Sequence, residues 1–168
     1  MILVALGSNL PSTAGPPVAT IAAGLAWLRA NGVVPAKVSR LYESAAWPDP
    51  SDPPFVNAVT QVETDLQPAA LLSRLHEAEE SFGRVRGARN APRTLDLDVL
   101  DYDGRVEQGP PQLPHPRMDE RAFVLVPLAE IAPDWRHPQS GKSVAELISA
   151  LSGHGDGVRA RPIASPDR

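Results

Sequence analysis

The sequence predicts an α+β fold of the ferredoxin-like type, in which an antiparallel sheet carries two helices on one face. Apolar residues alternate in some segments and recur with helical spacing in others, and Gly- or Pro-rich turns separate these segments. The resulting order is strand, helix, strand, strand, helix, strand, which is the βαββαβ arrangement. A C-terminal helical extension follows it. A length of 168 residues suits one domain with one core. We therefore expect a single domain over 1–152 and a polar, loose tail over 153–168.

The first half of the chain supplies three of the strands and one helix. They are expected at 2–6 (strand), 17–30 (helix), 38–47 (a weaker strand) and 55–64 (strand). The first strand is an uninterrupted apolar run that ends at Gly7-Ser8-Asn9. The helix has an apolar stripe and ends at Asn31-Gly32, whereas the last strand shows near alternation of apolar and polar residues.

The second half begins with a helix and ends with helices. We expect a helix over 68–83, a strand from Leu95, a helix over about 119–131 and a short helix over 143–151. Asp103-Gly104 is a two-residue hairpin signal that should send the chain back through Val106. Proline-rich loops precede the strand at 55 and the helix at about 119.

The composition excludes several classes of protein. The net charge is −4, which does not favour a broad nucleic-acid-binding surface. There is no cysteine, so neither a disulfide framework nor a thiolate metal site exists. No apolar stretch reaches the roughly 18 residues of a membrane span, and no signal peptide is recognisable. We therefore expect a cytoplasmic protein without a membrane partner. Of the 16 basic residues, all but Lys37 and Lys142 are arginine, which reflects either anion recognition or genome composition.

Two carboxylates stand on one face of the strand that begins at Leu95. A solvated polar face is the commonest explanation of Asp96 and Asp98 in such a strand. However, Asp is disfavoured in strands and like charges on one face repel, so the pair has a cost that a function could offset. Two strand residues span roughly 6.6 Å, which lets both carboxylates converge on Mg²⁺. Because Mg²⁺ completes its shell with phosphate oxygens and water, the pair indicates an Mg-nucleotide site.

Basic residues stand immediately before this strand. Arg84, Arg86, Arg89 and Arg93 lie within ten residues. A solvated basic loop explains them equally well in isolation. Beside a metal-binding strand, however, guanidinium groups would stabilise the charge of a transferring phosphoryl group. His115, held between two prolines, could add a phosphate donor, although a lone histidine is more often structural. There is no G-x-x-x-x-G-K-[ST] motif.

An aromatic pair and an amide complete the candidate residues. Phe55 and Asn57 share a face of their strand, and Phe123 follows the second proline-rich loop. With only three Phe in the chain, a place in the core is the ordinary expectation for both rings. The alternative is a flat heterocycle stacked between the rings and hydrogen-bonded by the amide.

Several segments together resemble one enzyme family. "LGSNL", "FVNAV", "GRVR…PRTLDLDVL" and "LPHPRMDERAFVLVPLAEIAP" occur in this order between residues 2 and 135. This combination is similar to 6-hydroxymethyl-7,8-dihydropterin pyrophosphokinase of folate biosynthesis. The resemblance implies that ATP donates its β,γ-pyrophosphoryl unit to the pterin hydroxymethyl oxygen and that AMP is released. It also implies a ferredoxin-like fold, and two Mg²⁺ ions held by Asp96 and Asp98.

The resemblance further assigns roles to individual residues. Those implied to contact phosphates are Arg84, Arg86, Arg93, His115 and Arg121. Those implied to bind the pterin are Phe55 and Phe123 by stacking, Asn57 by hydrogen bonding, and Ser44, Ala45 and Trp47 mainly by their backbone. Those implied to complete the ATP site are His76, Glu79 and Val99. One departure is the loop sequence "RNAPR", which lacks the Trp-Gly that this family often carries before Pro-Arg.

Two other functions remain open on the sequence. A two-metal nucleotidyltransferase also places acidic residues on a ferredoxin-like sheet, but a small acidic chain does not favour a polymer substrate. A non-catalytic ferredoxin-like ligand-binding module would need no paired carboxylates beside arginines. We expect a monomer that acts on small molecules and not on nucleic acid.

Overall fold

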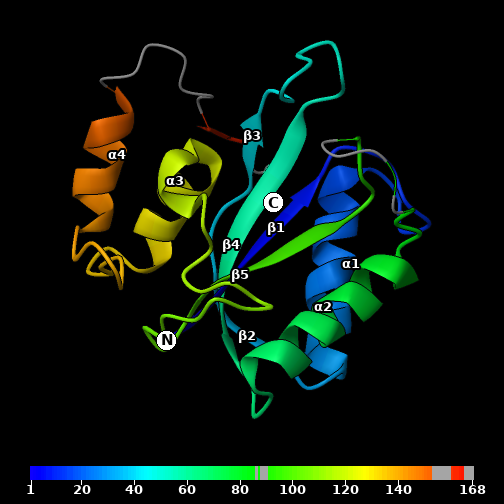
Figure 1. Ribbon diagram of the computed structural model, residues 1–168. Coiled ribbons are helices and arrows are strands. Elements are labelled where there is room, and N and C mark those ends of the chain that lie inside the picture. The colour runs from blue at the N-terminus through cyan, green and yellow to red at the C-terminus, as the bar shows by residue number, and fades with distance from the viewer. Residues whose placement is uncertain (86, 88–90, 153–159, 165–168) are drawn as a thin grey trace.

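The computed structural model describes residues 1–85, 87, 91–152 and 160–164 (Figure 1). Its strands are β1 (Ile2–Ser8), β2 (Val34–Val38), β3 (Tyr42–Ser44), β4 (Phe55–Glu63), β5 (Asp96–Tyr102) and β6 (Arg161–Pro162). Its helices are α1 (Pro17–Ala30), α2 (Pro68–Ser81), α3 (Ala122–Ile131) and α4 (Val144–Ser152), with a 3-10 turn, η1 (Met118–Glu120), before α3. Among the described residues, no helix is both long and apolar enough to cross a membrane.

The strands form one antiparallel sheet in the order β5-β1-β4-β3-β6, and β2 also pairs with β4. The ferredoxin-like arrangement predicted from the sequence is confirmed. The second strand of that arrangement is divided into β2 and β3, whereas we expected one strand within 38–47. Only Pro35 of β2 is buried, so this segment lacks the alternation that identifies a strand. Ser39 interrupts it by bonding to the backbone of Val59, accepting from its N–H and donating to its C=O.

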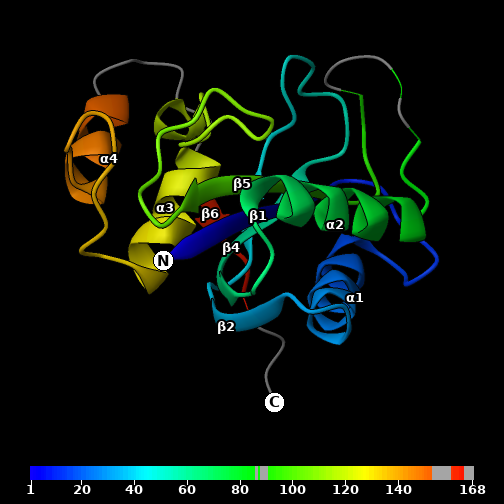
Figure 2. The same cartoon turned by 60° about the horizontal axis from the view of Figure 1, so that its bottom comes forward.

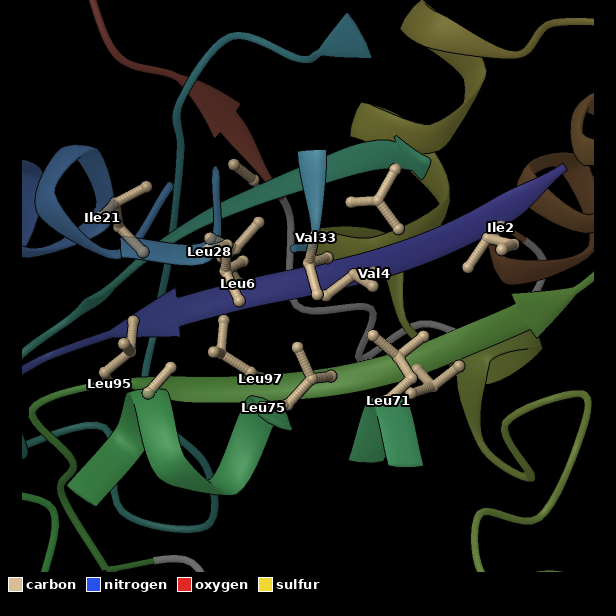
Figure 3. Close-up of a cluster of buried hydrophobic side chains, with 14 of the residues drawn as sticks. Ile2, Val4, Leu6, Ile21, Leu28, Val33, Leu71, Leu75, Leu95 and Leu97 are labelled. Carbon is tan, nitrogen blue, oxygen red and sulfur yellow. The ribbon is translucent and has the colours of Figure 1, made fainter. Parts of the chain in front are cut away.

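Helices lie on both faces of the sheet: α1 and α2 pack on one face, whereas on the other α3 packs on β4 and α4 packs against α3. In Figures 1 and 2, α1 and α2 lie on one side and α3 and α4 on the other. Leu71 and Leu75 of α2 pack with Leu6 and Leu97 of the sheet in the first core, as Figure 3 shows. The second core joins α3 and α4 to the opposite face, with Leu125 among its fully buried residues. The C-terminal extension therefore covers the face that the basic βαββαβ fold would leave bare.

Strand β5 presents different chemistry to the two cores. Leu95, which precedes it, and Leu97 and Val99 within it are buried in the first core. Asp96 and Asp98 therefore project to the opposite face, as the alternation predicted. The register with β1 shifts between Leu3 and Val4, and beyond that shift Leu100 packs in the second core.

Three local differences from the expected elements concern chain ends and turns. The Asp103-Gly104 turn is present, with φ of 52° and 69°, but Glu107 then bridges Leu113 and does not return along β5. Helix α3 begins at Ala122, because residues 118–120 form the 3-10 turn. Within the segment expected to be a loose tail, β6 pairs with β3.

Candidate functional site

A cavity of about 290 Å³ opens between the sheet and α3. Its floor is the end of β1 at Ala5–Gly7, and its walls come from β3, β4, β5 and the start of α3. Ten of the residues predicted for the site line it: Ser44, Ala45, Trp47, Phe55, Asn57, Arg93, Asp96, Asp98, Arg121 and Phe123. Residues from four separated segments of the sequence thus meet in one place.

The carboxylate of Asp96 lies between two arginines. Arg84 Nη1 donates to its Oδ1 at 2.8 Å, and Arg93 Nη1 donates to its Oδ2 at 2.7 Å. All three side chains are largely buried, with exposed fractions of 20–26%. Charge-assisted hydrogen bonds of this length are among the stronger polar contacts in proteins. Arg84 and Arg93, both predicted to bind phosphates, therefore converge on the predicted metal ligand Asp96.

The second carboxylate, Asp98, has different surroundings. The pKa of its carboxyl is raised, first by desolvation within the site and then by the neighbouring charge of Asp96. His115 Nε2 lies 3.9 Å from Asp98 Oδ2. Arg121 and Arg93 lower the pKa of Asp98 in part, but a carboxylate that is desolvated and repelled by its neighbour would be stabilised further by an added cation.

His115 is held as a hydrogen-bond donor toward the site. The backbone N–H of Arg117 donates to its Nδ1 at 3.2 Å, so the neutral ring carries its proton on Nε2, the nitrogen nearest Asp98. Desolvation lowers the pKa of the imidazole, although the charge of Asp98 opposes this effect. The predicted phosphate donor therefore has a fixed tautomer, and the pKa of its imidazole lies below the ordinary value.

Glu79, which lies on α2, contacts Arg84 and holds it in place. Its buried carboxylate accepts from the Leu97 N–H at 2.8 Å and contacts Arg84 Nη1. Arg84 is thus bound between Glu79 and Asp96. Desolvation is the main cause that raises the pKa of Glu79, to about 7, while the Leu97 N–H and Arg84 lower it in part.

This pKa predicts a pH-dependent contribution to stability. The pKa of Glu79 is about 7 in the folded protein and 4.5 ordinarily, so between pH 4.5 and pH 7 the folded state binds a proton that the unfolded state does not. The free energy of unfolding therefore falls as pH rises through this range. Glu79→Gln removes that loss. Between pH 4.5 and pH 8 the free energy of unfolding should therefore shift by about 3 kcal/mol in favour of the variant. Denaturant unfolding across this range measures it, and parallel pH profiles for the two proteins would contradict it.

The aromatic end of the cavity contains an oriented amide. Asn57 Nδ2 donates to Ser44 Oγ at 2.8 Å, which fixes the orientation of the amide group. Phe55 and Phe123 line the same cavity, and the Arg121 guanidinium lies 5.6 Å from the Phe123 ring centroid. Trp47 is 58% exposed. The geometry provides flat apolar surfaces with a polar group between them, which suits a planar heterocycle.

Gly7 separates the two ends of the cavity. A Cβ built there would lie 3.5 Å from Asn57 Oδ1, 3.7 Å from Phe55 Cδ1 and 3.9 Å from Asp96 Cβ, all ordinary contact distances. Gly7→Ala should therefore fold with a free energy of unfolding within about 1 kcal/mol of the unsubstituted protein. Its methyl group would nevertheless occupy the floor between the carboxylate and the amide. We expect at least a tenfold weaker binding of a heterocyclic ligand, measured by calorimetry; unchanged affinity would show that ligands do not reach the floor.

The other predicted residues that the structure describes, Arg84, His115, His76, Glu79 and Val99, lie outside the cavity lining. Val99 is buried in the first core, so its side chain does not reach the cavity. His76 lies on α2 one turn before Glu79. Arg86 falls outside the described residues. Sequence reasoning did not predict Gly7, Arg117 or Leu151 as lining residues. The end of the apolar run before Gly7 could have indicated that Gly7 borders a site. Nothing in the sequence indicates this for Leu151.

The fold and the site together define a class, that of a small-molecule transferase acting on a phosphorylated donor. A family model described as 7,8-dihydro-6-hydroxymethylpterin-pyrophosphokinase (HPPK) matches residues 3–133. This chain belongs to that family. The resemblance inferred from the sequence motifs is thereby confirmed.

The similarity to curated proteins supports the same family. The chain is 41% identical over 151 residues to 2-amino-4-hydroxy-6-hydroxymethyldihydropteridine pyrophosphokinase of Synechocystis, covering 89% of this chain and 75% of that protein. It is 42% identical over 151 residues to the protein of the same name from Pseudomonas aeruginosa, covering 89% and 90%. Among solved structures, Plasmodium falciparum HPPK-DHPS superposes with a TM-score of 0.68 at 13% identity. That match covers 90% of this chain and 44% of the longer chain, and it supports the fold.

Proposed function

We propose that this protein transfers the pyrophosphoryl group of ATP to the hydroxymethyl oxygen of 6-hydroxymethyl-7,8-dihydropterin and releases AMP. One observation carries the proposal: a single cavity joins an acidic and arginine-rich end to an aromatic end with an oriented amide. The first suits the phosphates of a nucleotide and the second suits a pterin ring. Family membership supplies the reaction that connects them.

The residues present fit the Mg²⁺ that this reaction implies. Asp96 and Asp98 offer only oxygen ligands from one face of one strand, which Mg²⁺ prefers. Among the described residues, no group of three or more His, Asp or Glu side chains could hold a metal. A cation bound here would therefore take its other ligands from water and phosphate. When bound, it would neutralise charge that develops on the transferring group. We propose two such ions, as the resemblance implies.

The arginine and histidine side chains of the site would bind the phosphates. Arg84, Arg93 and Arg121 would bind phosphate oxygens, because guanidinium groups match their geometry. His115 would donate from Nε2. We also assign Arg86 to the phosphates by resemblance alone. Asp96 is the counter-anion of Arg84 and Arg93. An arriving polyphosphate gives these arginines other anions to bind and so releases the Asp96 carboxylate.

The pterin would occupy the other end. Phe55 and Phe123 would stack on its faces, while the Asn57 amide would pair with its polar edge. Ser44, Ala45 and Trp47 line this end and would contribute mainly backbone groups. For the nucleotide, His76 and Glu79 of α2 and the backbone of Val99 complete the proposed site. Of these, Glu79 acts through Arg84, which it contacts.

Product analysis tests the proposal. The protein is mixed with MgATP and the hydroxymethyl pterin, and nucleotides are separated by chromatography. We expect AMP and a pterin pyrophosphate in equal amounts. Release of pyrophosphate would indicate a nucleotidyltransferase, and ADP a simple kinase. Ligand binding without any turnover would favour a non-catalytic module.

We further propose that residues 1–152 form the catalytic domain, since both cores and the cavity are built almost entirely from them. The net charge of −4 supports small-molecule substrates rather than nucleic acid. A requirement for ATP supports a cytoplasmic location. We propose a monomer because a single chain contributes both ends of the cavity.

A further inference from the structure

Asn9 connects two loops that border opposite ends of the cavity. It is 3% exposed and follows β1. Its Oδ1 accepts from the backbone N–H of Arg93 at 2.7 Å, and its Nδ2 donates to the backbone C=O of Pro53 at 3.0 Å. The chain separations are 84 and 44 residues. One amide group therefore joins the end of the arginine loop to the loop that enters β4.

The Arg93 backbone is held on both of its polar groups. Besides the bond from its N–H, its C=O accepts from the N–H of Asn9 at 3.0 Å and from that of Leu10 at 3.1 Å. Three hydrogen bonds from residues 9 and 10 therefore fix the start of the Arg93 side chain. The guanidinium of that side chain then meets Asp96 at 2.7 Å.

The other bond acts at the aromatic end. Pro53 precedes Phe55 by two residues, and Phe55 and Asn57 line the cavity on β4. Only a side chain with a donor and an acceptor can satisfy the Pro53 C=O and the Arg93 N–H together. Asp has the same shape but lacks the donor, whereas Ala lacks both groups.

We infer that Asn9 is a positioning residue, which sets the Arg93 side chain and the entry to the pterin strand relative to each other. This inference rests on the proposed function, and it assigns to Asn9 no contact with substrate. Loss of the amide would remove the side-chain partner of the Pro53 C=O and of the Arg93 N–H and let each loop move independently. We expect the loss of Asn9 to slow the chemical step because it displaces the Arg93 side chain.

A double-mutant cycle tests this route. Asn9→Ala should lower the single-turnover rate about a hundredfold in the otherwise unsubstituted protein. In the Arg93→Ala background, the same substitution should lower the rate by less than about threefold, since the group it positions is gone. Equal factors in both backgrounds, or no loss in the first, would overturn the inference.

Two further variants keep the test decisive. Asn9→Asp preserves the shape and the acceptor for Arg93, so it should retain MgATP affinity within about threefold but weaken pterin binding about tenfold by calorimetry. Equal effects on both ligands would refute separate roles. Asn31→Ala is the matched control: its Nδ2 donates to the Trp27 C=O at 2.8 Å at the end of α1, and it should change neither rate nor affinity. If the unsubstituted protein released no AMP, the proposed function would fail, while the Asn9→Asp binding data would still decide the positioning role.

Discussion

Asp98→Asn should abolish nearly all turnover while leaving the protein at least as stable. The pKa of Asp98 is raised in the folded protein, so its ionised form is disfavoured there and lowers stability above the unfolded pKa. A neutral amide of the same shape removes that penalty together with the repulsion from Asp96. Without the carboxylate, however, the site would lose a proposed ligand of the cation that would neutralise the transferring group. We expect AMP release to fall by about a thousandfold or more.

Asp96→Asn should have a comparable effect on turnover but the opposite effect on stability. Its carboxylate is the common partner of Arg84 and Arg93, so its loss leaves two partly buried cations facing an amide. Thermal unfolding and single-turnover rates on both variants separate the two effects. Asp65→Asn, an exposed position at the distant end of β4, controls for the change in net charge. Near-normal AMP release by either site variant would exclude the proposed metal ligands.

The alternation of residues made this acidic pair predictable from the sequence. Leu95, Leu97 and Val99 could be assigned to a core, which placed Asp96 and Asp98 on the other face. Helices α1 and α2 were equally visible, because their stripes repeat with the helical period. Strand β2 was not, since four of its five residues are exposed and its burial follows no strand period.

The polar network of the site could not be predicted in the same way. Nothing in the periodicity of α2 indicates that Glu79 reaches the Leu97 N–H and Arg84. The bonds of Asn9 join positions that are far apart in the sequence and become neighbours only when β1, β4 and β5 pair. The residue types in the sequence indicated which functional groups the site could contain. The register of the strands decides which of these groups lie within hydrogen-bonding distance of one another. The Gly7–Asp96 and Gly7–Asn57 pairings, for example, place a residue without a side chain between the two ends of the cavity.

Arg93→Ala should reduce the rate of the chemical step far more than the affinity for MgATP. The Arg93 guanidinium is bound to Asp96, and its backbone is fixed by Asn9 and Leu10. Contacts within the protein thus orient it, which is the condition for stabilising charge that appears only in the transition state. Arginines that act on a transferring phosphoryl group contribute about 10³-fold or more to rate. We expect a loss of that order in single turnover and at most about tenfold in equilibrium binding.

Arg93→Lys distinguishes orientation from charge. A lysine keeps the charge but offers a point donor in place of the planar fork, so it should recover only part of the lost rate. Arg105→Ala is the control, because Arg105 stacks over Tyr102 at 4.8 Å, does not line the cavity, and should leave both measurements unchanged. If Arg93→Ala lowered MgATP affinity as much as it lowered the rate, the guanidinium would serve ground-state binding alone. Its bond to Asp96 would then only neutralise the charge of that carboxylate. A selective loss of rate would instead mean that the same geometry prepares the arginine for the transferring group.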